Sequence, residues 1–563
     1  CVSGGGRWLS LGIAHPVHGR VVLTDSAPFP DGLRRDQQAV RRYRASLADP
    51  ERAGFGVALL SRRHQAYLIE DGIPLAVHGP GDGAALARVE VTTFAPAGRA
   101  GAVQVIRIAA RGVPFDFDAA WTGETLLRRA AYTELTEGGP LPPMPERSRS
   151  GGDRVVRWFE DPELGAAAIA LPAPARVAPG TSERVIVAIA LARDRDAAIA
   201  DAVALRDEAI GLLRDEVAAR RRSWRGGGRD GEDQRSRAVR RGIAYALDCA
   251  ACATQGTVAV LADHEILPLV WTRDAYYVCA ALRAAAGEPR ATVTVRGFVR
   301  WLFEAAQRPG GWWPRSSLAC GAPKDLAFQL DQQLYPLLLA RESGIHEDDA
   351  WEVIERLLAR RTDFGLLATS ETPADDALAQ PFHFSSHVLL WHVLARFGHA
   401  AADELRAATR RHFTADGRFA YAIAGPDGRG ARYYHDANDL PLVFAPGWGF
   451  CPPDDPVWQA TVDFAWSTRN AGFFPGRFGG LGSLHTPHPW PLGDLQRVVL
   501  ARLGADAAAE DEAWTRLDQV SLSDGLLPEA YDARTGAAVS RHWFAWPAAL
   551  RSFLAADPRT VAP

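Results

Sequence analysis

A chain of 563 residues is longer than one ordinary hydrophobic core can serve, so its length predicts more than one domain. Hydrophobic residues make up 47% and charged residues 23%, a balance that is typical of globular proteins and excludes a disordered or fibrous chain. The formal net charge of −4 gives no reason to expect nucleic acid or a membrane as a partner, and no apolar run could span a bilayer. The sequence leaves the oligomeric state open.

The cysteines and the first residue bear on metal binding and compartment. Six cysteines in this length are too sparse for a disulfide scaffold. Cys249 and Cys252 form a CxxC pair, but no second pair and no histidine pair follows at zinc spacing. We therefore predict buried thiols, and neither a metal nor a cofactor. The chain begins at Cys1 without a recognisable signal peptide, so we expect a cytoplasmic protein, with a secreted protein or a lipoprotein as the alternatives.

Residues 1–200 contain strand patterns. Short segments rich in Val and Ile, such as "ARVEVTTFA", "AVQVIRIAARG" and "ERVIVAIALAR", are separated by Gly, Pro and Asp clusters. This spacing predicts an antiparallel β-sandwich. A charged helical pattern and the Gly-rich stretch "RGGGRDGEDQRSR" follow, so residues 201–235 are predicted to be a linker helix and a flexible linker.

Residues 236–563 change to a helical period. In "ATVTVRGFVRWLFEAAQ", for example, apolar residues recur three to four positions apart. Helix alternates with loop to the end of the chain, which predicts an all-α domain of roughly a dozen helices. Helical hairpins can stack as a solenoid or close into an (α/α) barrel, and the lack of a fixed sequence period favours the barrel.

The loops between these helices place acids and amides beside aromatic rings. The segment 433–450, "YYHDANDLPLVFAPGWGF", holds two prolines and glycines, so we predict a loop there. Sugars present hydroxyls at the rim, which charged and amide groups bind, and C–H faces, which aromatic rings cover. Any one loop could be only core and helix caps, but eight together predict a carbohydrate pocket. They are 269–277, 310–317, 326–338, 369–386, 434–441, 479–494, 525–532 and 540–547.

These loops resemble glycoside hydrolase family 125, the inverting exo-α-mannosidases with an (α/α)6 barrel, over about residues 240–555. The matching motifs are Trp271-Thr272-Arg273-Asp274, Leu330-Asp331 with Tyr335-Pro336, Ala374-Asp375-Asp376, Asp436-Ala437-Asn438, Gly479-Gly480 with His485, and Leu527-Pro528-Glu529. "GLLPE" and "FQLDQQ" are also similar to bacterial family 15 glucoamylases, which share the barrel. A β-rich N-terminal domain is typical of those enzymes and of family 65 phosphorylases.

The resemblance implies roles for individual residues. Inversion needs a general acid and a general base, and the motifs place the acid at Asp375 or Asp376 and the base at Glu529. Glu371 is a third candidate for the acid. The candidates for sugar binding are Trp271, Arg273, Asp274, Asp331, Asp436, Asn438, His485, Trp490, His542 and Trp543.

The sequence therefore predicts an exo-acting, inverting α-glycoside hydrolase, in the first place an α-mannosidase. A glucoamylase-like α-glucosidase is the alternative within the same class. A non-catalytic glycan-binding protein would be expected to lack one of the two carboxylates, and both positions are filled. A family 65-like phosphorylase would need a phosphate site in place of Glu529. Bulky loop residues, among them Trp312, Trp313 and Trp448, favour a closed pocket over an open groove.

Overall fold

The structure is a computed structural model that divides the chain into two compact units, Cys1–Glu232 and Asp233–Pro563. We describe each unit by itself. The described residues are 1–24, 54–57, 64–79, 87–117, 120–123, 125–130, 135–136, 139–140, 149–223, 234–254, 256–285, 287–522, 524–540 and 543–563.

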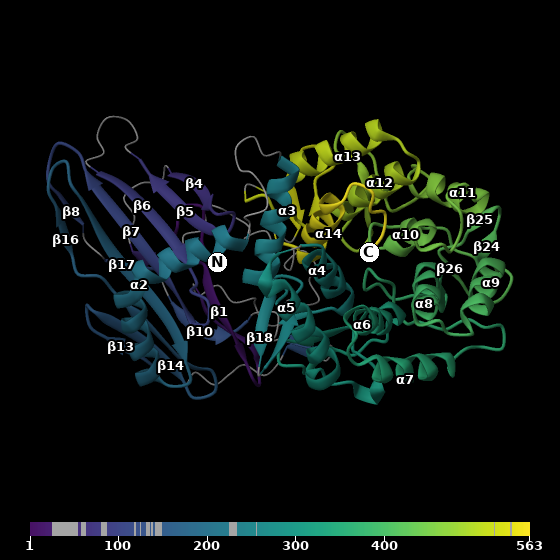
Figure 1. Ribbon diagram of the computed structural model, residues 1–563, viewed down its shortest axis with the longest axis horizontal. Coiled ribbons are helices and arrows are strands. Elements are labelled where there is room, and N and C mark those ends of the chain that lie inside the picture. Colours follow the sequence, from purple (N-terminus) through teal and green to yellow (C-terminus); the bar gives the residue numbers. More distant parts are fainter. Residues whose placement is uncertain are drawn as a thin grey trace. The chain divides into compact units, whose positions relative to one another are not determined.

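The first unit is built on an eight-stranded antiparallel sheet (Figure 1). Its order is β13 (Arg149–Gly152), β14 (Val156–Asp161), β15 (Gly165–Ala170), β17 (Ser182–Ala192), β7 (Gly101–Ala110), β6 (Ala87–Phe94), β5 (Ile73–His78) and β4 (His64–Ile69). A three-stranded sheet contains β1 (Ser10–His15), β2 (Gly19–Thr24) and β10 (Leu126–Arg129). Shorter pairs join β3 (Gly56–Val57) to β9 (Trp121–Thr122), β8 (Phe115–Phe117) to β16 (Ala175–Val177), and β11 (Leu135–Thr136) to β12 (Gly139–Pro140).

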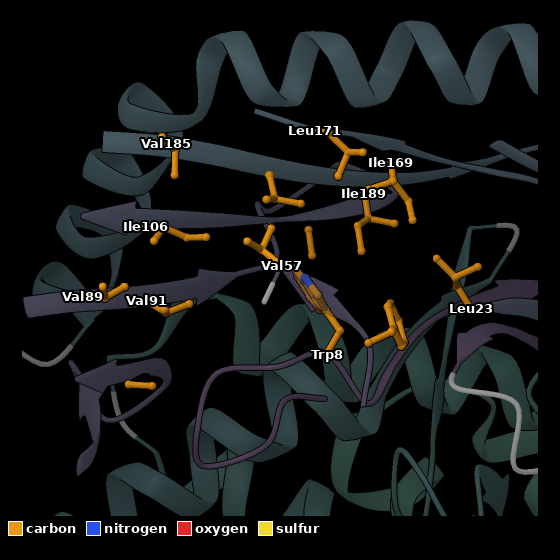
Figure 2. Close-up of a cluster of buried hydrophobic side chains, with 14 of the residues drawn as sticks. Trp8, Leu23, Val57, Val89, Val91, Ile106, Ile169, Leu171, Val185 and Ile189 are labelled. Atoms are coloured by element: carbon orange, nitrogen blue, oxygen red, sulfur yellow. The ribbon is translucent and has the colours of Figure 1, made fainter. Parts of the chain in front are cut away.

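Both faces of the large sheet are covered. Ile106 on β7 lies opposite Val91 on β6 and Val185 on β17, and these side chains join Trp8 and Leu23 in one core (Figure 2). Helix α2 (Arg195–Ser223) covers the other face. Its small side chains Ala198 and Ala202 share a buried cluster with Val103 and Val105 of β7. The helical part of the predicted linker thus belongs to the core of this unit. Residues 224–233 lie outside the described residues.

The second unit is helical. Its helices are α3 (Gln234–Tyr245), α4 (Thr272–Ala284), α5 (Pro289–Arg300), α6 (Leu330–Ser343), α7 (Glu347–Leu358), α8 (Phe384–Phe397), α9 (Ala402–Phe413), α10 (Leu440–Trp448), α11 (Pro456–Ala465), α12 (Pro491–Leu503), α13 (Ala507–Val520) and α14 (Ala545–Ala556), with short turns η3 (Ala246–Ala250), η4 (Trp301–Ala305) and η5 (Pro309–Gly311). The prediction of a β-rich region followed by a helical region is confirmed. No helix in the described part of the chain is both long and apolar enough to cross a membrane.

The helices alternate between two burial patterns along the chain. Helices α4, α6 and α8 are buried on all sides over their first eleven residues. Helices α7 and α9 bury only residues spaced three to four apart, so they keep one face in water. We call α4, α6, α8, α10, α12 and α14 the inner helices, because each is buried through most of its first turns.

One sequence prediction was wrong. Residues 433–450 are not a loop throughout, because Leu440–Trp448 forms α10. Pro441 occupies the first turn, where a missing N–H costs nothing, and Pro446 lies near the end. Gly449 then ends the helix at a φ of 87°, in the left-handed region that glycine adopts readily.

Candidate functional site

The candidate residues gather where the inner helices begin. The residues that immediately precede α4, α6, α8 and α10 are Trp271, Gln329, His383 and Asp439. Carboxylates occur in or next to the first turns of several inner helices and are buried, with Asp331 only 2% exposed. The unpaired N–H groups and the positive dipole end of a helix favour negative charge at this position. The fold therefore supports a concentration of buried acids at one end of the inner helices.

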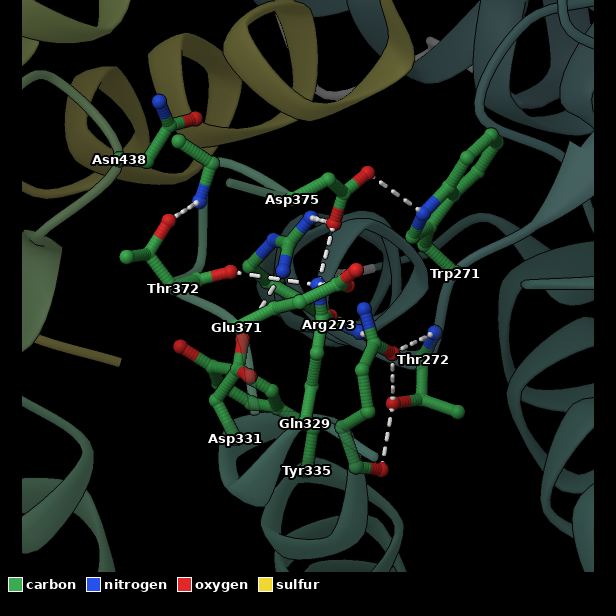
Figure 3. A network of polar contacts seen from close by, with 12 residues as sticks. Trp271, Thr272, Arg273, Gln329, Asp331, Tyr335, Glu371, Thr372, Asp375 and Asn438 are labelled. Carbon is green, nitrogen blue, oxygen red and sulfur yellow. Dashed lines mark hydrogen bonds and ion pairs between the residues drawn. The ribbon is translucent and has the colours of Figure 1, made fainter. Parts of the chain in front are cut away.

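Arg273 on α4 lies at the centre of one group of these acids (Figure 3). Its guanidinium donates to Asp331 Oδ2 at 2.9 Å and to Asp375 Oδ1 at 3.4 Å, and it stacks 5.1 Å from the centre of the Trp546 ring. Burial lowers the pKa of Arg273, but the charges of Asp331, Asp375 and Asp274 outweigh it and raise the pKa overall. The arginine is a permanent cation that holds carboxylates from two other segments.

Gln329 joins the two carboxylates of the 371–376 loop. Its Nε2 atom donates to Asp375 Oδ1 at 2.7 Å, to Glu371 Oε2 at 3.0 Å and to the Thr372 carbonyl at 3.2 Å (Figure 3). The indole N–H of Trp271 donates to Asp375 Oδ2 at 3.0 Å. Both oxygens of Asp375 thus accept N–H donors, which fix the orientation of the carboxyl group.

Glu371 lies beside this carboxyl and is paired with Arg315, whose NH1 atom is 2.8 Å from Oε1. Burial raises the pKa of Glu371, Arg315 lowers it in part, and the charge of Asp375 raises it again. Burial also raises the pKa of Asp331, against the charge of Arg273. Glu371 and Asp331 therefore bind protons more readily than isolated acids do.

The backbone turns at Asp375. Its φ is 63°, in the left-handed region that aspartate enters more often than most residues other than glycine. Hydrogen bonds from the Thr372 amide to the Asp376 carbonyl and from the Asp375 amide to the Thr372 carbonyl hold the turn. Such conformations persist where the surroundings over-determine them, often at functional sites.

A hairpin brings His485 into contact with Asp376, the residue that follows Asp375. Strands β28 (Gly480–Ser483) and β29 (His488–Pro489) carry His485 at the tip, and its Nδ1 atom is 3.2 Å from Asp376 Oδ1. The same hairpin reaches the 434–439 loop, because the Ala437 amide donates to the Gly482 carbonyl at 2.9 Å. The hairpin therefore joins two of the loops that the sequence singled out.

Acids from two loops raise the pKa of His485. The surrounding protein lowers its pKa by desolvation, but the hydrogen bond and charge of Asp376 and the charges of Glu529 and Asp375 raise the pKa overall. The side chain is nevertheless 38% exposed. The charges of Asp375, Asp376 and Glu529 therefore act together on an imidazole that solvent can reach.

Asp436 and Asp439 form a buried pair below the hairpin. Tyr434 donates to Asp436 Oδ2 at 3.2 Å, and the Asn438 amide donates to Oδ1 at 2.8 Å. Burial and the charge of Asp439 raise the pKa of Asp436, so its protonated form is favoured. Burial also acts to raise the pKa of Asp439, but His383 outweighs it and lowers the pKa, so this carboxylate stays ionised.

Glu529 is fixed at the start of strand β30 (Ala530–Tyr531), which pairs with β31 (Ala538–Ser540). It is 5% exposed. Its amide donates to the Ser540 carbonyl at 3.2 Å, and the Ser540 hydroxyl donates to its carboxylate. The backbone contact fixes the position of Glu529 in the strand pair, and the Ser540 hydroxyl restrains one carboxylate oxygen.

The remaining predicted residues differ in position. Asn438 is buried, and its Nδ2 atom has no hydrogen-bond partner among the described residues. Asp274 lies 3.5 Å from Arg273 and is also buried. Trp490 is 3% exposed and its N–H donates to the Thr486 carbonyl, so the ring is packed in protein. Trp543 is half-buried, and its N–H donates to Asp524. His542 lies outside the described residues.

Sequence reasoning missed several polar partners of these acids. Gln329 and Arg315 lie within segments that were recognised, but neither was selected, because an isolated amide or arginine gives no spacing signal. Tyr434 and Ser483, which contact Asp436, were missed for the same reason. Taken alone, the described residues of Asp233–Pro563 bring no three His, Cys, Asp or Glu side chains within ligand distance of one another.

Residues 362–554 match a family model described as metal-independent alpha-mannosidase (GH125). The predicted resemblance to this family is confirmed over these residues. The protein is a glycoside hydrolase. The matched stretch contains Glu371, Asp375, Asp376, His485 and Glu529 of the hydrolase. No curated protein matches the chain.

Solved structures also resemble the hydrolase. A bacterial glucoamylase in complex with acarbose is 11% identical, with a TM-score of 0.55 over 89% of this chain and 87% of that chain. At this identity the likeness shows a shared fold. A Streptococcus pneumoniae structure from a family of metal-independent alpha mannosidases, in a non-productive complex with alpha-1,6-mannobiose, is 21% identical, with a TM-score of 0.46 over 62% of this chain and 97% of that chain.

Proposed function

We propose that the protein is an exo-acting, inverting α-mannosidase. The observation that carries this proposal is the contact of His485 Nδ1 with Asp376 Oδ1 at 3.2 Å, on an imidazole that the charge of Glu529 also reaches. Inversion requires two carboxyl groups, one on each side of the scissile bond, and the 375–376 pair and Glu529 are the groups proposed for it. The family match supports mannose as the sugar. We also propose that the first unit is a β-sandwich and that the inner helices close into an (α/α)6 barrel.

Glu529 is the proposed general base. A base must hold a water against the anomeric carbon, so its carboxylate needs a fixed direction. The Ser540 hydroxyl, which donates to the Glu529 carboxylate, supplies that restraint on a strand that the backbone bond to Ser540 holds in place.

Asp375 is the proposed general acid, with Asp376 as the alternative. Asp375 shares the Gln329 donor with Glu371 and the Arg273 cation with Asp331. Its side chain is 22% exposed, so a leaving-group oxygen can approach it.

The sugar-binding role is proposed for polar groups around this pair. Asp331 Oδ1, Gln329 Oε1 and Asn438 Nδ2 are buried atoms without hydrogen-bond partners among the described residues. Buried polar atoms are normally satisfied, so these unsatisfied ones are suited to sugar hydroxyls after a small adjustment. Exo action is proposed because the bulky residues of the loops favour a closed pocket over an open groove.

The test is hydrolysis of aryl α-mannosides, aryl α-glucosides and α-linked disaccharides, with proton NMR of the fresh product. Release of β-mannose from an α-mannoside is the expected result. Glu529→Gln should lower kcat by about 10²–10⁴-fold while retaining sugar binding. Glu404→Gln is the matched control, since Glu404 is 70% exposed on α9. The α-anomer as first product would contradict inversion, and activity on α-glucosides alone would favour the glucoamylase-like alternative.

A further inference from the structure

A buried polar group lies behind the loops that carry Glu529 and His485. Asp494 is in the first turn of α12 and is 2% exposed. The hydroxyl of Tyr531 donates to Asp494 Oδ2 at 2.5 Å, and Arg516 Nε on α13 is 3.5 Å from Asp494 Oδ1. We call Asp494, Tyr531 and Arg516 the brace.

The brace connects the two backbone segments that carry Glu529 and His485. Tyr531 belongs to β30, two residues after Glu529. Arg516 donates through NH1 to the Gly479 carbonyl at 2.7 Å, and Gly479 directly precedes β28, which leads to His485. One buried carboxylate therefore connects the strand of Glu529 with the hairpin of His485.

The surrounding backbone leaves little freedom for these connections. A Cβ atom added to Gly493, next to Asp494, would lie 2.2 Å from the Leu481 carbonyl of β28. The Phe478 amide donates to the Ala533 carbonyl at 2.8 Å. This bond links the residues just before Gly479 to those that follow β30. A change of geometry in the brace would thus be passed to both loops rather than absorbed.

The brace buries the ionisable carboxyl group of Asp494, which a purely apolar contact would avoid. Burial raises the pKa of Asp494 to about 7, against the hydrogen bond of Tyr531 and the charges of Arg516 and Arg497. Burying a carboxylate is unfavourable unless its partners are well placed. Directional hydrogen bonds fix distances more sharply than apolar packing does, which is the benefit expected at a site that needs a fixed separation.

We propose that Asp494, Tyr531 and Arg516 are positioning residues of the hydrolysis, which set where the Glu529 carboxylate stands relative to the His485 hairpin. The inference rests on the proposed role of Glu529. None of the three is placed in contact with the sugar. They act through the backbone, so their loss should affect the reaction step more than substrate binding.

The decisive variant is Tyr531→Phe, which removes one hydroxyl and keeps the ring. Misplacing a reacting group by a fraction of an ångström to 1 Å lowers rates by up to about 10²-fold, so we expect kcat to fall about 10–10²-fold with KM changed less than about threefold. The loss should be equal for aryl α-mannosides with good and poor leaving groups, because the base and not the acid is displaced.

Tyr276→Phe is the matched control. Tyr276 is equally buried, and its hydroxyl donates to the buried carboxylate of Glu342 at 3.1 Å, which also pairs with an arginine, Arg283. The two variants remove the same kind of bond, so similar shifts of Tm are expected. Only Tyr531→Phe should lower kcat, and an equal kcat for the two variants at matched Tm would overturn the inference.

Asp494→Asn provides a second test that does not depend on losing the tyrosine. The amide can still accept the Tyr531 hydroxyl but no longer ionises between Tyr531, Arg516 and Arg497. In the wild type, protonation of Asp494 below about pH 7 weakens its contact with Arg516, so kcat should fall more steeply with falling pH than in Asp494→Asn. Identical pH profiles would contradict the proposal. A wild type without glycosidase activity would instead refute the proposed function, which separates the two failures.

Discussion

The carboxyl groups of the candidate site are chemically alike, but their partners differ. Asp331 is held by the buried Arg273, and Glu371 by Arg315. Asp375 accepts the N–H groups of Trp271 and Gln329, whereas the next residue, Asp376, is 44% exposed and meets His485. These partners orient each acid separately, so one short loop can supply groups with different roles.

The proposed acid can be separated from its neighbour by leaving-group dependence. Asp375→Asn should lower kcat about 10²–10⁴-fold on a disaccharide but far less on a dinitrophenyl α-mannoside, because a good leaving group needs little protonation. Asp376→Asn is the matched control and should show no such difference. Steady-state kinetics on both substrates decide between them. Leaving-group dependence in Asp376→Asn alone would move the acid to Asp376.

The raised pKa of Asp494 predicts that the free energy of unfolding depends on pH. Its pKa of about 7 in the folded state lies above the ordinary value of 3.8. The folded state therefore binds this proton more tightly, and the resulting contribution is full below about pH 4 and lost as the pH rises through 7. Each pKa unit corresponds to about 1.4 kcal/mol.

Asp494→Asn removes that titration. The free energy of unfolding of the wild type should decrease between pH 6 and pH 8 by more than that of the variant, by about 1 kcal/mol or more. Urea denaturation at the two pH values measures the difference. Parallel changes in wild type and variant would show that Asp494 titrates in the ordinary range.

The buried first turns of the inner helices explain why polar site residues gather there. Inner helices such as α4 and α6 are buried on all sides, so their first turns must satisfy free N–H groups inside the protein. Acids and amides at these positions do so. Gln332 Oε1, for example, accepts the Thr272 amide of α4 at 2.8 Å. Helix ends of this kind supply many of the buried polar groups of the site, while the β28–β29 and β30–β31 strand pairs position His485 and Glu529.

The contact between α12 and β28 can be tested with a single methyl group. Gly493→Ala would place Cβ against the Leu481 carbonyl, so we expect a loss of about 1–3 kcal/mol in unfolding free energy and lower activity through the His485 hairpin. Thermal unfolding and kcat are the measurements.

Gly504→Ala is the control for this change. Gly504 ends the same helix at a φ of −87°, and the nearest atom to an added Cβ is 3.5 Å away. A neutral or slightly stabilising effect is expected there. Equal destabilisation by both substitutions would show that the close approach at Gly493 is unimportant.

The sequence predicted the segments of the site better than their pairings. Apolar period and helix length identified most helices, because these signals are local. Gln329 bonds residues that lie 42 to 46 positions further along the chain, and no local pattern encodes such a contact. Trp490 was expected at the sugar but is packed in protein, since an aromatic ring in a loop suits either environment. The α10 helix was missed because its prolines outweighed its apolar composition.

The candidate site residues and the large β-sheet core belong to different units. Every described candidate residue of the site belongs to Asp233–Pro563. The unit Cys1–Glu232 has apolar side chains on both faces of its large sheet, with Ile106 and Val187 fully buried on one face and Val103 on the other. Its stability can therefore be lowered without altering a proposed catalytic group.

Ile106→Ala tests this division. The side chain is fully buried in the core that contains Trp8 and Leu23, so the cavity should cost about 2–5 kcal/mol in the unfolding of this unit. Val17→Ala is the control, since Val17 is 67% exposed and should change stability by less than about 0.5 kcal/mol. Hydrogen exchange should show faster exchange in β6, β7 and β17 of the first variant. At a temperature where both variants remain folded, kcat should equal that of the wild type, because Asp375, His485 and Glu529 are untouched. A fall of kcat in folded Ile106→Ala would show that the β-rich unit shapes the reaction centre, and the division of roles would be wrong.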